Sequence, residues 1–328
     1  MELETSAPIS IDILLDRVRL GKYQYWVYLV LGVHYLCDGA EVIAISLLSA
    51  ILQKEWNISN SQISSLGSSV FIGVFVGSVM SGLLADHIGR KKIYMSSLIL
   101  SIITCFLSAF APTYNTMLWL RAGYGASFGF IQPCFAAYIA EITPKDYRGR
   151  ALSVVSLLFT AGELFGWFFA RIFLDSYTSG NWRVLLFWVG VPNLVAIVVA
   201  FFILEESPRF ALFHKFENGI SVLNTMHKMN NQGIALRLDE YEREDLKKWI
   251  ESEKNKNFTK ESKFKMLFIN ENLPVTCKLS IMWFVLSFAY YGITFILPLV
   301  YAAQGSDSSD EGGESLNDLL WGILGELP

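Results

Sequence analysis

Long apolar runs separated by short polar segments dominate the chain, and this pattern predicts a bundle of membrane-spanning helices. A hydrocarbon core of roughly 30 Å needs about 20 mostly apolar residues per helix. By that measure we predict seven spans, at Tyr25–Leu52, Ser61–Ala85, Ile93–Ala111, Thr116–Ile139, Ala151–Leu174, Val184–Leu204 and Val275–Ala302. An eighth span is expected to start near Asn317. The predicted fold class is therefore an all-α membrane protein.

The polar segments divide the chain into four regions. Residues 1–22 predict a cytoplasmic amphipathic N-terminus, whose stretch Ile9–Leu20 is expected to form a helix along the inner membrane surface. Residues 23–204 predict one six-span bundle. Residues 205–273 predict a cytoplasmic linker of solvated helices, because charges of both signs alternate there. Residues 274–328 are expected to begin a second bundle with span seven, an acidic outer loop and the start of span eight.

Composition supports the membrane assignment. The 328 residues are 53% hydrophobic and only 17% charged, which is typical of multi-pass membrane proteins rather than soluble enzymes. We therefore expect the lipid bilayer as a partner, no nucleic acid and no enzymatic activity. The 4 cysteines have no C-x-x-C spacing and no histidine at ligand distance, so no metal or cofactor site is predicted.

The loops differ in charge on the two sides of the predicted bundle. Basic residues precede the first span and follow the second and the fourth, whereas the loop between the third and fourth spans has no cation. The positive-inside rule then puts the N-terminus and the long linker in the cytoplasm. The sequence does not specify which cellular membrane holds the protein.

The first predicted span carries three ionisable side chains, His34, Asp38 and Glu41, at positions i, i+4 and i+7. On a helix they fall on one face, within a sector of about 60°. Ionisable groups inside a membrane are costly and face a wet cavity or a partner. Two carboxylates one turn apart repel each other, which favours the protonated form of one of them. The span therefore predicts a proton-coupling site, with hydrogen bonding inside the bundle as the alternative.

Four polar residues in other spans are further candidates for the same site: Arg121, Gln132, Glu163 and Arg171. Arg121 lies near the outer end of span four, where it can reach the carboxylates of span one or extend to water. Glu163 is in the middle of span five and should face a cavity or pair with a cation. Gln132 lies deeper in span four. Arg171 lies near the outer end of span five, where an ion pair with Asp175 is the simpler explanation.

A short charged turn joins the second and third spans, with the sequence GLLADHIGRKK at residues 82–92. It resembles the G-x-L-a-D-r-x-G-R-k-k signature of the major facilitator superfamily, with His87 where that pattern usually has Arg or Lys. Asp86 and Arg90 are four residues apart and can pair if the turn is helical. Gly82 and Gly89, in the same turn, allow a sharp change of direction and a close approach of helix ends.

Two further segments resemble elements of sugar porters and their relatives. The sequence YIAEITPKDYRG at residues 138–149 resembles Y-x-a-E-x-x-P-x-x-x-R-G, and ESPR at residues 206–209 resembles P-E-S-P-R-W. The resemblance implies a cytoplasmic charge network that biases one conformational state by a few kcal/mol at most. Its expected members are Asp86, Arg90, Glu141, Arg148, Glu206 and Arg209. Arg121 also matches an R-x-x-x-G motif, which implies a role in proton or substrate coupling.

Within the superfamily, the chain is similar to synaptic vesicle glycoprotein 2-related and organic-ion transporters. The similar features are GKYQ at residues 21–24, CDGAE at residues 37–41 and a short first outer loop. The implied function is alternating-access secondary transport of a small organic ion, coupled to protons. A sugar porter is a second alternative.

Members of the superfamily have twelve spans in two halves, with substrate bound between them. The resemblance covers Lys22–Ala302 only. We therefore expect either a truncated product or a half-transporter that works with a second half or a larger membrane complex. The competing function is a non-transporting membrane subunit that acts as a scaffold.

Overall fold

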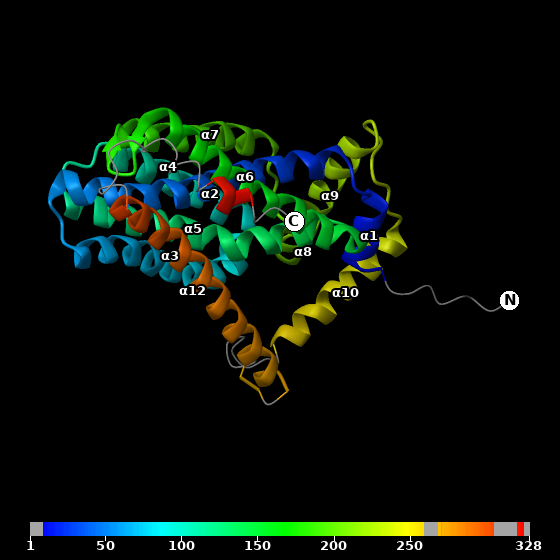
Figure 1. The fold of residues 1–328 in the computed structure, drawn as a ribbon. Coiled ribbons are helices and arrows are strands. Elements are labelled where there is room, and N and C mark those ends of the chain that lie inside the picture. Colours follow the sequence, from blue (N-terminus) through cyan, green and yellow to red (C-terminus); the bar gives the residue numbers. More distant parts are fainter. Residues whose placement is uncertain (1–8, 259–267, 270, 305–319, 325–328) are drawn as a thin grey trace.

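The computed structural model describes residues 9–258, 268–269, 271–304 and 320–324 (Figure 1). Nearly all of the described chain is helical, and a two-residue turn joins the short antiparallel pair β1–β2. The elements are α1 (Ile11–Val18), α2 (Lys22–Trp56), α3 (Asn60–Ile88), α4 (Arg90–Ala109), α5 (Tyr114–Ile142), η1 (Lys145–Tyr147), α6 (Arg148–Phe173), β1 (Leu174–Ser176), β2 (Ser179–Gly180), α7 (Trp182–Ile203), α8 (Pro208–His214), α9 (Phe216–Asn230), α10 (Glu240–Phe258) and α12 (Leu273–Gln304).

Each of the seven predicted spans forms a helix, and six of the described helices are long and apolar enough to cross a membrane. These are α2, α3, α4, α6 with its preceding turn, α7 and α12. The helix over the fourth predicted span, α5, is not among them, so seven apolar spans is one too many by that criterion. Three glycines, Gln132 and Arg121 lower its hydropathy, and its glycines pack against α3 and α4. The predicted start of an eighth span near Asn317 lies outside the described residues.

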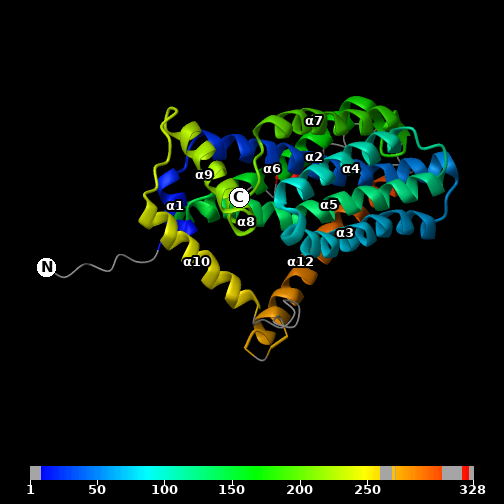
Figure 2. The same ribbon diagram turned by 180° about the vertical axis from the view of Figure 1, so that it is seen from behind.

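The six helices α2 to α7 form one bundle with a repeated packing pattern (Figures 1 and 2). Helix α2 packs against α6 and α7, and α5 packs against α3 and α4 in the same way. Helices α4 and α7 meet each other and join the two groups. Chain segments far apart in sequence therefore converge on α2 and α5, which carry the buried residues His34, Asp38, Glu41 and Arg121.

Glycines allow the two closest helix crossings. A Cβ atom at Gly162 of α6 would lie 1.9 Å from the carbonyl oxygen of Leu36, and one at Gly73 of α3 would lie 2.0 Å from that of Ala122. Such small residues let membrane helices approach backbone to backbone. The predicted close contact does not extend to Gly82, because no atom lies within 4 Å of a Cβ built there.

Helices α1, α8, α9 and α10 gather at one end of the bundle, which we call the linker end (Figure 2). The apolar face of α1 is buried in this cluster, with Leu14, Leu15 and Val18 no more than 1% exposed. The cluster also includes Leu223 of α9 and Leu246 of α10. The apolar face of α1, expected to contact the inner membrane surface, therefore packs against protein. An amphipathic stripe requires an apolar partner but does not specify lipid or protein, and here the partner is the folded linker.

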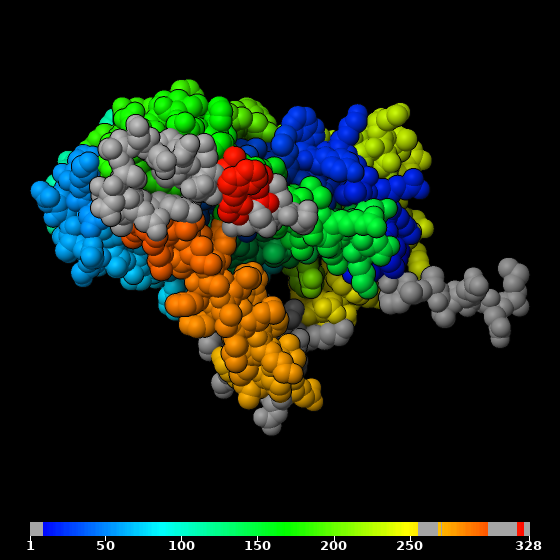
Figure 3. Space-filling view, in the orientation of Figure 1, coloured from blue at the N-terminus to red at the C-terminus, as the bar shows by residue number. Residues whose placement is uncertain are grey.

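Helix α12 contacts the bundle along only part of its length. Its C-terminal half crosses α2 and α3, where Tyr291 and Phe295 pack against Phe71 at ring distances of 4.8 and 6.1 Å. Its N-terminal half projects away from the bundle (Figure 3). Large side chains there are exposed, including Trp283 and Phe284. The first helix after the linker therefore leaves a space between itself and the bundle.

Candidate functional site

The centre of the bundle holds a buried ion pair between α2 and α5. Arg121 Nη1 donates to Glu41 Oε2 at 2.6 Å, and the two residues are only 1% and 2% exposed. From the sequence, Arg121 was expected either to extend to water or to reach a carboxylate of span one. In the structure it pairs with Glu41. Its guanidinium also lies 5.7 Å from the ring centroid of Tyr124. One positive charge is thus fixed beside one negative charge.

The second oxygen of Glu41 contacts a cysteine. Cys105 Sγ of α4 lies 2.8 Å from Glu41 Oε1, so the thiol donates to the carboxylate. Glu41 is therefore held from two sides, by a cation and by a weak donor. An apolar span gives no signal that one of its cysteines contacts a charge, so the sequence did not single out Cys105.

Asp38 lies one turn away on α2 in a different environment. The Tyr124 hydroxyl donates to Asp38 Oδ1 at 2.9 Å, and His34 Nε2 lies 4.0 Å from the same oxygen. Within the described part of the chain, Asp38 Oδ2 and both ring nitrogens of His34 are buried without a hydrogen-bond partner. Among the described basic side chains, His34 alone lies within 4.0 Å of Asp38. Asp38 thus differs from Glu41 in having no fixed cation.

Two adjoining cavities open beside these carboxylates. A cavity of about 30 Å³ is lined by Asp38, Glu41 and Arg121, which is room for a water molecule because one needs about 10–15 Å³. A second cavity of about 370 Å³ shares Phe128 and Tyr291 with the first. It lies among α2, α3, α5, α6 and α12. The polar face predicted for the first span therefore faces internal space.

The remaining candidates in the spans have different positions. Gln132 lines the larger cavity and donates to the Tyr35 hydroxyl at 3.0 Å. Glu163 is 1% exposed and accepts a hydrogen bond from the hydroxyl of Tyr290 on α12. Arg171 is exposed near the end of α6 and lines neither of the two central cavities.

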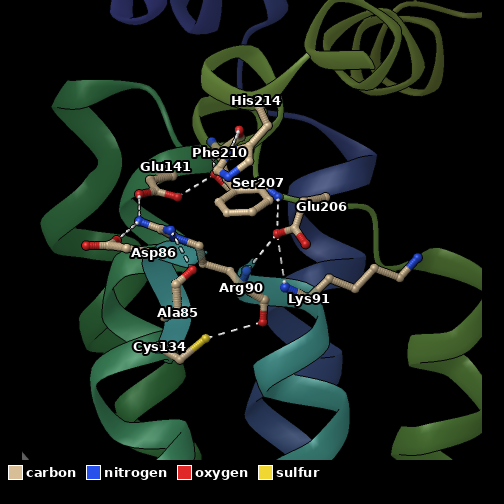
Figure 4. Close-up of polar contacts among 10 residues, drawn as sticks. All are labelled: Ala85, Asp86, Arg90, Lys91, Cys134, Glu141, Glu206, Ser207, Phe210 and His214. Atoms are coloured by element: carbon tan, nitrogen blue, oxygen red, sulfur yellow. Dashed lines mark hydrogen bonds and ion pairs between the residues drawn. The ribbon is translucent and has the colours of Figure 1, made fainter. Parts of the chain in front are cut away.

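At the linker end, Arg90 is the centre of a charge network (Figure 4). Its Nη2 atom lies 2.9 Å from Asp86 Oδ1 and 3.0 Å from Glu141 Oε1, and its Nη1 atom donates to the carbonyl of Ala85 at 2.9 Å. The guanidinium also lies over the Phe210 ring, 5.7 Å from its centroid. The predicted pairing of Asp86 with Arg90 is present, and it connects α3, α5 and α8 to the first residue of α4.

Glu206 binds the N-terminus of α4. Its Oε1 atom accepts the backbone N–H groups of Arg90 and Lys91 at 2.8 and 3.1 Å. A carboxylate at a helix N-terminus is favoured by the unpaired amides and by the helix dipole. Gly89 precedes α4 with a φ of 105°, and a Cβ there would lie 2.2 Å from Glu206 Oε2. Only glycine fits this turn.

Two predicted members lie outside the network, and one residue was missed. Arg148 pairs instead with Asp12 of α1 at 2.6 Å, because the folded N-terminus occupies the space beside it. Arg209 is exposed and lies over the ring of Phe213. Ser207 was not predicted; its hydroxyl donates to Glu141 and caps α8 by accepting from a backbone amide. Ser207 could have been predicted as a member of the network because it directly follows Glu206.

Comparison with known proteins agrees with this architecture. Human synaptic vesicle glycoproteins 2B and 2C are 26% and 27% identical to the chain over 91% and 90% of its length. Rat synaptic vesicle glycoprotein 2A is 27% identical over 85% of the chain. The chain spans about half the length of these relatives, with 48%, 45% and 42% of them covered.

The fold is similar to that of the xylose transporter XylE from E. coli in a partially occluded, inward open conformation. The TM-score is 0.56 at 22% sequence identity, over 63% of this chain and 56% of that one. At this identity the likeness concerns the fold alone. The Major Facilitator Superfamily matches residues 29–324, which confirms the resemblance found in the charged turn, and the chain belongs to that family.

Proposed function

We propose that this chain forms one half of a secondary active transporter that moves a small organic solute by alternating access and couples that movement to protons. The observation that carries the proposal is the unequal pairing of two buried carboxylates. Glu41 has Arg121 at 2.6 Å, whereas Asp38 has only a tyrosine hydroxyl and His34 beside it. A group that must gain and lose a proton in each cycle cannot be neutralised by a fixed cation.

The two carboxylates then have separate roles. Arg121 pairs with Glu41 and anchors α5 to α2, because separating a buried ion pair leaves an uncompensated charge. Asp38 binds and releases the proton through its free oxygen, and the small cavity beside it supplies space for a water molecule. Solute occupies the larger cavity next to it.

The charge network at the linker end supports the conformational part of the cycle. We place this end in the cytoplasm, because it carries the basic residues that follow α3 and α5. Arg90 joins Asp86 and Glu141 there, and a set of such pairs favours the state in which the helix ends are together. In this family, solute passes between two halves of a transporter. The second half comes from the remainder of a longer chain or from another polypeptide.

The experiment is uptake by proteoliposomes that contain the full natural protein, with an imposed pH gradient and a panel of organic cations, organic anions and sugars. We expect gradient-driven uptake of at least one solute, and its loss in Asp38→Asn with folding intact. Trp119→Leu, which changes an exposed ring of α5 outside the cavity, is the control and should leave uptake unchanged. Unchanged uptake in Asp38→Asn would remove that residue from the mechanism.

A non-transporting membrane scaffold subunit is the second candidate. A chain that acts as a scaffold should purify with a stable membrane partner and show no solute flux with or without a gradient. Flux in liposomes that hold this protein alone would exclude that role.

A further inference from the structure

The cavity of about 370 Å³ has mainly aromatic walls. Tyr35 of α2 lies 5.3 Å from Phe159 of α6 between ring centroids, and Phe128 of α5 lies 6.5 Å from the same ring. On the opposite side, Phe71 of α3 meets Tyr291 of α12 at 4.8 Å. Five helices thus each supply a ring to one space, and the Phe159 ring contacts two of the others.

The charges next to this cavity are negative. Asp38 lies three residues from Tyr35 on α2 and lines the adjoining small cavity. Glu163 lies four residues from Phe159 on α6, is 1% exposed, and accepts a hydrogen bond from the Tyr290 hydroxyl. Both spacings are one helical turn, so each carboxylate neighbours a cavity ring. Arg121 lies in the same region, but its charge is offset by Glu41 at 2.6 Å.

We propose that this cavity binds an organic cation, a substituted ammonium whose alkyl groups contact the rings. Aromatic faces attract cations through the negative potential above the ring, and this attraction grows when water is excluded. The Gln132 amide and the Ser287 hydroxyl, which also line the cavity, suit a polar group at the other end of the ligand. The inference rests on the transport function proposed above and assigns its substrate class.

The position of Asp38 beside the cavity also determines whether proton and cation move in the same direction or in opposite directions. Asp38 in its ionised form attracts the bound ammonium, and protonation removes that attraction. Proton binding at Asp38 and cation binding in the adjoining cavity therefore oppose each other, and each lowers the affinity for the other by the same factor. This predicts exchange of a proton for a cation across the membrane, rather than movement of both in one direction.

The test compares choline with 3,3-dimethylbutan-1-ol, which has the same shape without the charge, in calorimetric titrations of the purified full-length protein. We expect choline to bind at least about tenfold more tightly, which corresponds to the larger cation–π contributions. Tetraethylammonium should compete with choline. This comparison uses the wild-type protein, so it does not depend on a variant that folds. Equal binding, or tighter binding of the neutral alcohol, overturns the proposal.

A variant pair locates the site. Phe159→Leu removes a ring from the cavity and should reduce the preference for choline about threefold or more. Trp119→Leu removes a ring from α5 that is 76% exposed and outside the cavity, and should leave the preference unchanged. A preference that survives both substitutions would place choline elsewhere and contradict the cavity assignment.

The two proposals fail in different ways. If a pH gradient drives uptake of a neutral or anionic solute through Asp38 while choline shows no preference, the substrate class is wrong and the transport function stands. If choline is preferred but no solute moves under any gradient, the cation site stands and coupled transport by the protein is wrong.

Discussion

Arg121 and Glu41 form a 2.6 Å ion pair between α5 and α2, and neither residue is more than 2% exposed. Desolvation offsets much of the attraction in such a pair, so its net contribution to folding is small. Removal of one partner alone leaves a buried charge without compensation. The pair is therefore a sensitive position for stability measurements.

We expect Arg121→Leu to destabilise the protein by about 3–5 kcal/mol, because Glu41 then remains buried beside only a weak donor. The double variant Arg121→Leu/Glu41→Gln should recover most of that loss. Thermal unfolding in detergent, followed by loss of monodisperse protein, measures both. A double variant as unstable as the sum of the single ones would mean that the two side chains do not interact.

Gly89→Ala should lower stability by about 1–3 kcal/mol, because the residue has a φ of 105° and a new Cβ would meet Glu206. Gly82→Ala is the matched control in the same motif. It lies inside α3 with open space around its Cα, so alanine should be neutral or stabilising there. Equal losses of stability in the two variants would count against the structure of this turn.

The charge network around Arg90 should control how easily a reagent reaches the thiol of Cys134. Cys134 is 2% exposed, and its Sγ lies 3.4 Å from the carbonyl of Arg90. In a Cys277→Ser background, which removes the exposed thiol, Arg90→Ala should raise maleimide labelling of Cys134 several-fold because the helix ends separate more often.

Arg209→Ala provides the control for that experiment. Arg209 lies near the same helices but contacts the Phe213 ring instead of a carboxylate. Its removal should leave the labelling rate of Cys134 at the background value. Equal labelling in the two variants would mean that the ion pairs of Arg90 do not hold this end of the bundle together.

Docking of α1 should depend on its apolar face more than on its ion pair. Leu15 is 1% exposed, and Leu15→Ala should cost about 2–5 kcal/mol. Asp12→Ala breaks a pair with Arg148 whose side chains are 49% and 28% exposed, and such pairs contribute about 0–1 kcal/mol. Limited proteolysis of the N-terminus in detergent compares the two. Faster cleavage of Asp12→Ala than of Leu15→Ala would reverse this ranking.

Sequence alone predicted the helices, the family and the charged pair Asp86–Arg90. Apolar runs of sufficient length have few alternatives to membrane helices, because each backbone amide must be bonded within its own segment. The pair Asp86–Arg90 is a local interaction four residues apart, so the spacing sufficed to predict it. The same reasoning put His34, Asp38 and Glu41 on one face of a helix.

Only the tertiary structure decided which of these groups met which partner. Residues 80 positions apart, Glu41 and Arg121, became neighbours because α2 packs against α7, α5 packs against α4, and α4 and α7 meet each other. The same packing brought a cysteine to Glu41 and a tyrosine to Asp38, and so made two similar carboxylates different. The apolar stripe of α1 required burial, but whether lipid or the linker would bury it depended on long-range packing. Periodicity specifies what a helix face needs, whereas the identity of its partner is set by contacts that no local pattern contains.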